Sequence, residues 1–195
     1  MRERAVPLAV TVLSGLLVGF LSATSNRVAP DGLVDHTVWS ATAQYAGGVA
    51  NSLVAWFWVP FALGRLESVS VGRANTWGAV FMATAFVTHD VHTWLHADVA
   101  SGVGPAPPMA SATLWLTLAI AVAGGVIAGT TGFLSRRRPV TALVLALVVV
   151  AELARRPLES WRSGISAAEN TTFVLLACAV VVGLAARSRA KAASR

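Results

Sequence analysis

The sequence predicts an all-helical integral membrane protein, and three observations support that prediction. Of its 195 residues, 55% are hydrophobic and only 12% are charged, whereas a typical soluble domain has roughly 25% charged residues. The apolar residues gather in runs long enough to cross a bilayer as helices, which takes about 20 residues. The basic residues stand in short clusters at the ends of these runs, as membrane topology requires. We therefore expect one membrane domain over residues 1–195.

Six apolar runs are expected to be transmembrane helices, at residues 5–23, 43–64, 75–96, 112–134, 139–155 and 168–186. The first follows Arg2 and Arg4, as the apolar part of a signal peptide would. It is long for that role and lacks a clean cleavage site, so we expect an uncleaved helix. Pro60 lies inside the second run and predicts a kink there. Pro139 is a favourable first residue for the fifth run, which is the shortest.

Small residues predict where these helices meet. Gly15 and Gly19 lie four residues apart in the first run, and Gly125 and Gly129 do so in the fourth. Such pairs place two glycines on one helix face, where they allow a second backbone to approach closely. We expect close helix packing at both positions.

The distribution of basic residues predicts the orientation. With the N-terminus in the cytoplasm, 11 of the 15 basic residues fall in inner segments and four in outer ones. The inner set is Arg2, Arg4, Arg65, Arg73, Arg136, Arg137, Arg138, Arg187, Arg189, Lys191 and Arg195; the outer set is Arg27, Arg155, Arg156 and Arg162. This asymmetry favours six spans with both termini cytoplasmic. It also explains the basic residues as topology signals, so the net charge of +6 does not indicate nucleic-acid binding.

Localisation and partners follow from the same pattern. We expect a multi-pass protein of a bacterial plasma (inner) membrane, surrounded by the lipid bilayer, with a homo-oligomer or a membrane partner left open. We expect a bacterial source because the sequence is rich in Arg, Ala and Val, a composition associated with GC-rich bacterial genomes. The one cysteine, Cys178, cannot form a disulfide within the chain and is expected to be an apolar packing or lipid-facing residue.

Several short motifs resemble an uncharacterised family of small bacterial multi-pass membrane proteins, a domain of unknown function. These are "ANSLVAWFWVPFALGRL", "GGVIAGTTGFLSRRR" and "VVVAELA". The positions that carry the resemblance are Asn51, Ser52, Phe61, Gly64, Gly125, Gly129 and Glu152. The third run departs from that pattern, because "THDVH" stands where the family has aromatic residues. The resemblance implies a multi-pass membrane fold and no particular activity.

Four polar residues inside the runs are candidates for a site. Counting about 1.5 Å per residue from the expected helix starts places His89 and Glu152 at a similar depth, about 20 Å from the inner surface. Asp90 adjoins His89, and Asn51 enters the second run from outside. Ionisable residues within a span usually face the bundle interior or a water-filled cavity. We therefore expect a polar pocket, open to the outside, formed by Asn51, His89, Asp90 and Glu152.

Histidines continue beyond this pocket. His89, His92 and His96 follow an i, i+3, i+7 spacing and fall on one helix face. The last two could supply half of a divalent-metal site, completed by His36, Asp98 or Glu152. No other cofactor is expected.

Three kinds of function remain open at this stage. In the first, Glu152 and Asp90 exchange protons or bind a cation, with His89 and His92 as modulators or ligands, so that the protein handles a solute, an ion or protons. In the second, the protein is a structural or partner subunit without a ligand, and Glu152 pairs with Arg156 four residues on. In the third, the histidines bind metal. No residues are identified as catalytic, and the sequence does not favour an enzymatic function.

Overall fold

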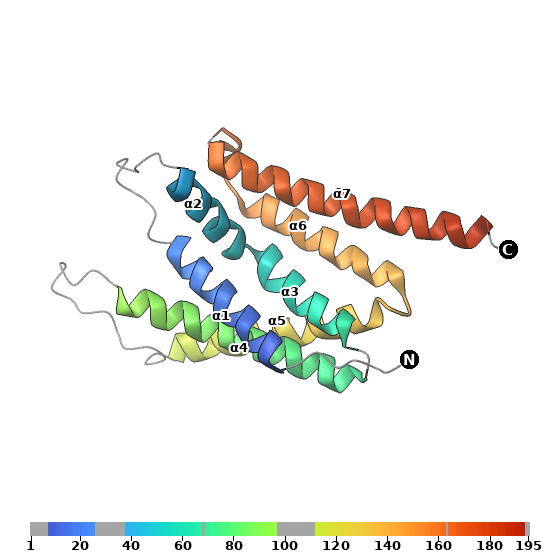
Figure 1. Cartoon of the computed structure of the whole chain (residues 1–195), viewed down its shortest axis with the longest axis horizontal. Coiled ribbons are helices and arrows are strands. Elements are labelled where there is room, and N and C mark those ends of the chain that lie inside the picture. Colours follow the sequence, from blue (N-terminus) through green and yellow to red (C-terminus); the bar gives the residue numbers. More distant parts are fainter. Residues whose placement is uncertain (1–7, 26–37, 68, 97–111, 163, 194–195) are drawn as a thin grey trace.

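The described part of the chain is entirely helical (Figure 1). The computed structural model describes residues 8–25, 38–67, 69–96, 112–162 and 164–193. Within these ranges the α-helices are α1 (Leu8–Ser25), α2 (Val38–Ala50), α3 (Leu53–Leu66), α4 (Val71–Leu95), α5 (Ala112–Leu134), α6 (Leu143–Arg155) and α7 (Gly164–Ala193). Two short 3-10 helices, η2 (Pro139–Ala142) and η3 (Leu158–Trp161), precede and follow α6. The prediction of an all-helical chain is confirmed for these residues.

Two of the helices, α5 and α7, are long and apolar enough to cross a membrane. The pair α2 and α3 passes the same test when taken together, although it is bent by 66°, and α1 is a shorter apolar helix. Helix α4 has 25 residues, long enough to cross, but its second half contains the polar stretch around His89 and Asp90. Helix α6 has 13 residues, about 20 Å, so on its own it falls short of a hydrocarbon core of about 30 Å.

The second apolar run is broken at Asn51 and Ser52. The Pro60 kink was expected to bend this run, but α3 continues through Pro60 and the bend lies several residues earlier. Ser52 is extended, and its hydroxyl accepts a hydrogen bond from the amide of Ala55 at 3.2 Å. Serine at this position satisfies an amide of the first turn that no helical carbonyl can reach. The break is therefore a capped helix start, which the proline-based expectation missed.

Glycines set the distance between the central helices. A side chain at Gly19 of α1 would collide with the carbonyl oxygen of Ala85 in α4. In the same way, Gly125 of α5 lies against the backbone of Gly78 in α4, and Gly129 is equally close to α4. The expectation of close packing at these glycines is confirmed. Because even a methyl group would not fit at these positions, α4 touches both α1 and α5 backbone to backbone.

Helices α6 and α7 form a pair that lies beside α2 and α3, away from α1 and α4 (Figure 1). Val54 of α3, Val149 of α6 and Phe173 of α7 make a buried cluster between them. The start of α1 and the end of α7 lie at the same end of the bundle, here named the terminal end. Successive helices run in opposite directions, with α2 and α3 together making one pass (Figure 1).

Candidate functional site

A hydrogen-bonded chain of three side chains meets the break between α2 and α3. The Ser22 hydroxyl, at the end of α1, donates to Oδ1 of Asn51 at 2.8 Å. Nδ1 of His89, on α4, lies 3.1 Å from the same hydroxyl. Ser22 is fully buried and Asn51 is exposed. The chain therefore links a ring in the half-buried part of α4 to an amide at the surface.

The roles of the atoms follow from the single hydrogen of the serine. Because the Ser22 hydroxyl gives that hydrogen to Asn51, it can only accept from His89. Nδ1 of His89 must then be protonated, as in one neutral tautomer or in the imidazolium ion. The ring also lies edge-on to Trp56 of α3, with centroids 6.4 Å apart. These contacts fix the orientation of the imidazole between α1, α3 and α4.

Asp90 follows His89 in the chain and acts on it electrostatically. Its Oδ2 atom is buried and has no hydrogen-bond partner among the described groups. A buried carboxylate oxygen without a donor is costly in free energy unless a proton or a cation neutralises it. Asp90 thus places a buried carboxylate oxygen without a donor next to His89 on α4.

Glu152, near the end of α6, is fully buried and saturated with donors. Its carboxylate accepts from the Leu53 amide at 2.9 Å, at the start of α3. Arg155 donates to both carboxylate oxygens, at 2.7 and 2.9 Å, and Arg156 donates to Oε1 at 2.8 Å. A carboxylate is favoured at a helix N-terminus, where amides point outward. The predicted pair between Glu152 and Arg156 is confirmed.

Arg156 extends this cluster to α7. Its guanidinium donates to Glu169 at 2.7 Å and to Asn170 at 3.0 Å, and it lies over the Phe173 ring at 4.8 Å. Burial alone lowers the pKa of Arg156, but the hydrogen bonds and charges of Glu152 and Glu169 outweigh it and raise that pKa. Two arginines thus face two carboxylates in a charge-balanced cluster, which we name the α6–α7 ion cluster: Glu152, Arg155, Arg156, Glu169 and Asn170.

The four residues expected to form one pocket are therefore distributed over two adjoining arrangements. Asn51 and His89 share the hydroxyl of Ser22, and Asp90 lies next to His89. Glu152 instead caps α3 immediately after the break and belongs to the ion cluster. The α2–α3 break is the element common to both.

Sequence reasoning missed several members of these arrangements. Ser22 lies in the polar ending "LSATS" of the first run, a serine-rich stretch that also suits a loop. Glu169 and Asn170 stand at the start of the sixth run, and an acidic residue within the bounds of an apolar run was the available signal. The opposite end of the fold holds another buried carboxylate, Glu67, which accepts from the Trp77 indole at 2.8 Å and from the Val69 amide at 2.8 Å.

Beyond the site, His92 and His96 lie on one face at the end of α4 as expected, and their rings lie against each other. The rings of His92 and His96 lie with centroids 4.6 Å apart, and Nδ1 of His96 is 2.9 Å from the carbonyl oxygen of His92. Phe20 of α1 meets His92 edge-on at 4.9 Å. In the described ranges, no group of three or more His, Cys, Asp or Glu side chains is arranged to hold a metal ion. His36 and Asp98, suggested as further ligands, lie outside the described residues.

Comparison with known proteins gives no relative from which a role could be transferred. No family model, curated protein or solved structure matches the chain.

Proposed function

We propose that the chain is a six-span plasma-membrane protein, with both termini cytoplasmic, that handles protons or a small cation at the α2–α3 break. Three features support this topology. Successive helices alternate in direction, and the start of α1 and the last turn of α7 lie at the same end of the bundle (Figure 1). The segments assigned to the inside also carry an excess of basic residues. In this arrangement α4 and α6 lie within the bundle, where His89 of α4 contacts α1 and Glu152 of α6 contacts α3 instead of lipid.

One observation carries the proposal, the chain from His89 through Ser22 to Asn51 at the break. Helices that are interrupted inside a membrane are where many transporters bind ions, because freed backbone groups and polar side chains meet there. Imidazole gains and loses a proton near neutral pH. Asp90 beside it supplies a negative charge that a proton or cation would neutralise. The exposed Asn51 gives this chain contact with the surface.

Within this proposal, Glu152 has a positioning role. Its two oxygens already accept four hydrogen bonds, and two guanidinium groups balance its charge together with that of Glu169. A carboxylate held in this way gains little from a proton. We assign proton or cation exchange to His89 and Asp90, and we assign to Glu152 the attachment of α6 to the start of α3.

A second candidate, a partner subunit without a ligand, is favoured by the outer face of α7. Val174, Leu175, Val181 and Val182 are exposed along this helix. In a membrane this face contacts either lipid or the helix of a partner protein. Metal binding by His92 and His96 remains a further proposal, tested by elemental analysis of purified protein and its loss in His92→Ala.

The decisive experiment measures ion movement into vesicles. Purified protein in proteoliposomes, with a trapped pH-sensitive dye and a clamped membrane potential, is expected to carry protons or Na⁺ faster than protein-free vesicles. Asp90→Asn and His89→Phe should abolish this flux, while the exposed Glu159→Gln should leave it unchanged. Folding of each variant is checked by its melting temperature. Absence of flux above protein-free vesicles, or unchanged flux in folded Asp90→Asn protein, contradicts the proposal and favours the partner-subunit role.

A further inference from the structure

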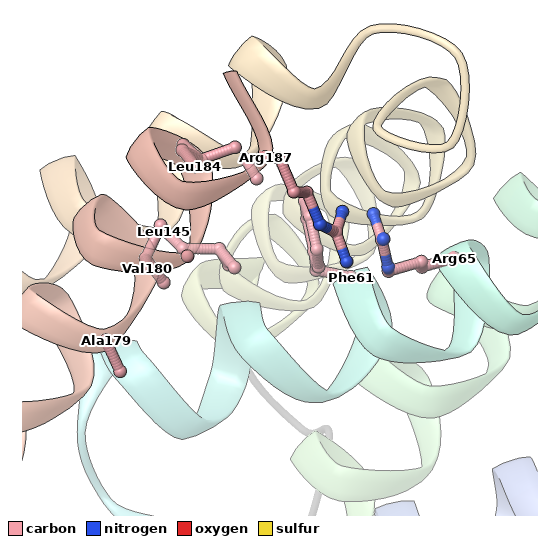
Figure 2. A pocket seen from close by; sticks show the side chains of 9 residues that line it. Phe61, Arg65, Leu145, Ala179, Val180, Leu184 and Arg187 are labelled. Atoms are coloured by element: carbon pink, nitrogen blue, oxygen red, sulfur yellow. The ribbon is translucent and has the colours of Figure 1, made fainter. Parts of the chain in front are cut away.

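A groove between α3, α6 and α7 opens near the terminal end of the bundle (Figure 2). Its volume is about 250 Å³. Apolar side chains from all three helices line it, among them Phe61, Leu145, Val180 and Leu184. Figure 2 shows two arginines at one end of this groove, Arg65 from α3 and Arg187 from α7, with their guanidinium groups turned toward one another.

The two arginines are like charges held close together. Arg187 and Arg136 both act electrostatically on Arg65. Arg65 donates a hydrogen bond to the Ser135 hydroxyl at 2.6 Å, which fixes the side chain without neutralising it. Among the described residues, neither Arg65 nor Arg187 forms an ion pair with a carboxylate. The contrast with Arg156, which meets two carboxylates, shows that this pair lacks a negative partner within the described fold.

A second hollow of about 420 Å³ adjoins the groove on the other side of Arg187. It shares Leu184 and Arg187 with the first and is also lined by Pro139 and Val140 of η2 and by Leu143, the first residue of α6. Two apolar hollows thus meet at one cationic residue. This arrangement matches a molecule with two apolar chains and one negative head.

We propose that this groove binds an anionic phospholipid, with its phosphate between Arg65 and Arg187 and its acyl chains in the two hollows. Guanidinium groups bind phosphate oxygens in pairs, and phosphate would remove the repulsion between the two arginines. A free phosphate ion would leave the apolar walls exposed, whereas a zwitterionic lipid would bring a positive charge to the same end. The proposal rests on the membrane location argued above, because the arginines then lie at the depth of the inner headgroups.

The test uses full-length protein, purified in detergent and freed of lipid. Phosphatidylglycerol and phosphatidylcholine with identical acyl chains are added in turn, and binding is followed by native mass spectrometry and by melting temperature. We expect phosphatidylglycerol to bind and to raise the melting temperature, phosphatidylcholine to bind at least about tenfold more weakly, and inorganic phosphate to have no effect.

Arg187→Gln should weaken phosphatidylglycerol binding by about tenfold, the effect of losing one charged contact. Arg187 is exposed, so this variant is expected to keep the lipid-free melting temperature of the wild type. Arg189→Gln, two residues along α7 and outside both hollows, is the matched control and should bind as the wild type does. Equal binding of both lipids, or equal loss in the two variants, overturns the proposal. Lipid binding is measured without ion flux, so failure of the flux experiment does not affect the lipid-binding result. Failure of the lipid-binding experiment likewise does not affect the flux result.

Discussion

Replacing Glu152 by glutamine should destabilise the protein strongly, because it removes the charge at the centre of the α6–α7 ion cluster. Removing one partner of a buried ion pair typically costs about 3–5 kcal/mol. Arg155 is 52% exposed and can turn to water, while Arg156 is only 13% exposed but keeps Glu169 at 2.7 Å. These compensations place the expected loss at the lower end, about 3 kcal/mol. For a chain of this size that corresponds to a melting temperature lower by about 6–12 °C.

The assay is equilibrium unfolding in mixed detergent micelles, followed by the fluorescence of the seven tryptophans. Glu159→Gln makes the same chemical change at an exposed position seven residues after Glu152, outside the ion cluster. It should alter the free energy of unfolding by less than about 0.5 kcal/mol. The double variant Glu152→Gln/Arg156→Gln should lose less than the sum of the single variants, since the residues are in contact. A folded Glu152→Gln protein of wild-type stability that has lost ion flux would refute the reasoning, because Glu152 would then be a functional group.

Other predictions concern packing, the hydrogen-bonded chain from His89 to Asn51, and the exposed apolar face of α7. Gly125→Ala should lower the free energy of unfolding by about 1–3 kcal/mol, because its methyl group collides with α4, whereas Gly124→Ala meets open space and should be neutral or stabilising in the same unfolding assay. Ser22→Ala should cost about 1–3 kcal/mol because it removes a fully buried hydroxyl that hydrogen-bonds to both Asn51 and His89. Ser14→Ala, at a half-buried position on the same helix, removes only a bond to its own helix and should cost less than about 0.5 kcal/mol; equal losses would contradict the role of Ser22. Cys178, exposed on α7, should react in intact membranes with an apolar maleimide much faster than with a charged one, and equal rates would contradict a lipid-facing position.

The sequence predicted the helices well because apolar runs leave few alternatives in a membrane protein. The run 112–134 coincides with α5, and Pro139 begins the segment expected to start there. The second run was the exception, because it is broken where Ser52 caps the start of α3. In the sequence, this serine looks like an ordinary polar residue within an apolar stretch. Local patterns show where a helix can form, but they do not show which side chain will satisfy its first amides.

The candidate site was harder to predict than the helices. Depth along each run placed His89 and Glu152 at a similar level, yet it could not tell which neighbouring helix each faces. Glu152 meets the start of α3 and two arginines, while His89 meets Ser22 of α1. These partners depend on which helices pack together, and those contacts join segments far apart in the sequence. Spacing within one run carries no information about that order.

Sidedness of the two ends of the bundle tests the central claim most directly. With Cys178 replaced by alanine, single cysteines are introduced as Glu159→Cys, after α6, and Arg137→Cys, after α5; both positions are exposed. In intact cells, a membrane-impermeant maleimide should label the cysteine at position 159 and should reach the one at position 137 only after the membrane is permeabilised. Labelling of both positions in intact cells, or of position 137 alone, would contradict a bundle that crosses the membrane with its terminal end in the cytoplasm.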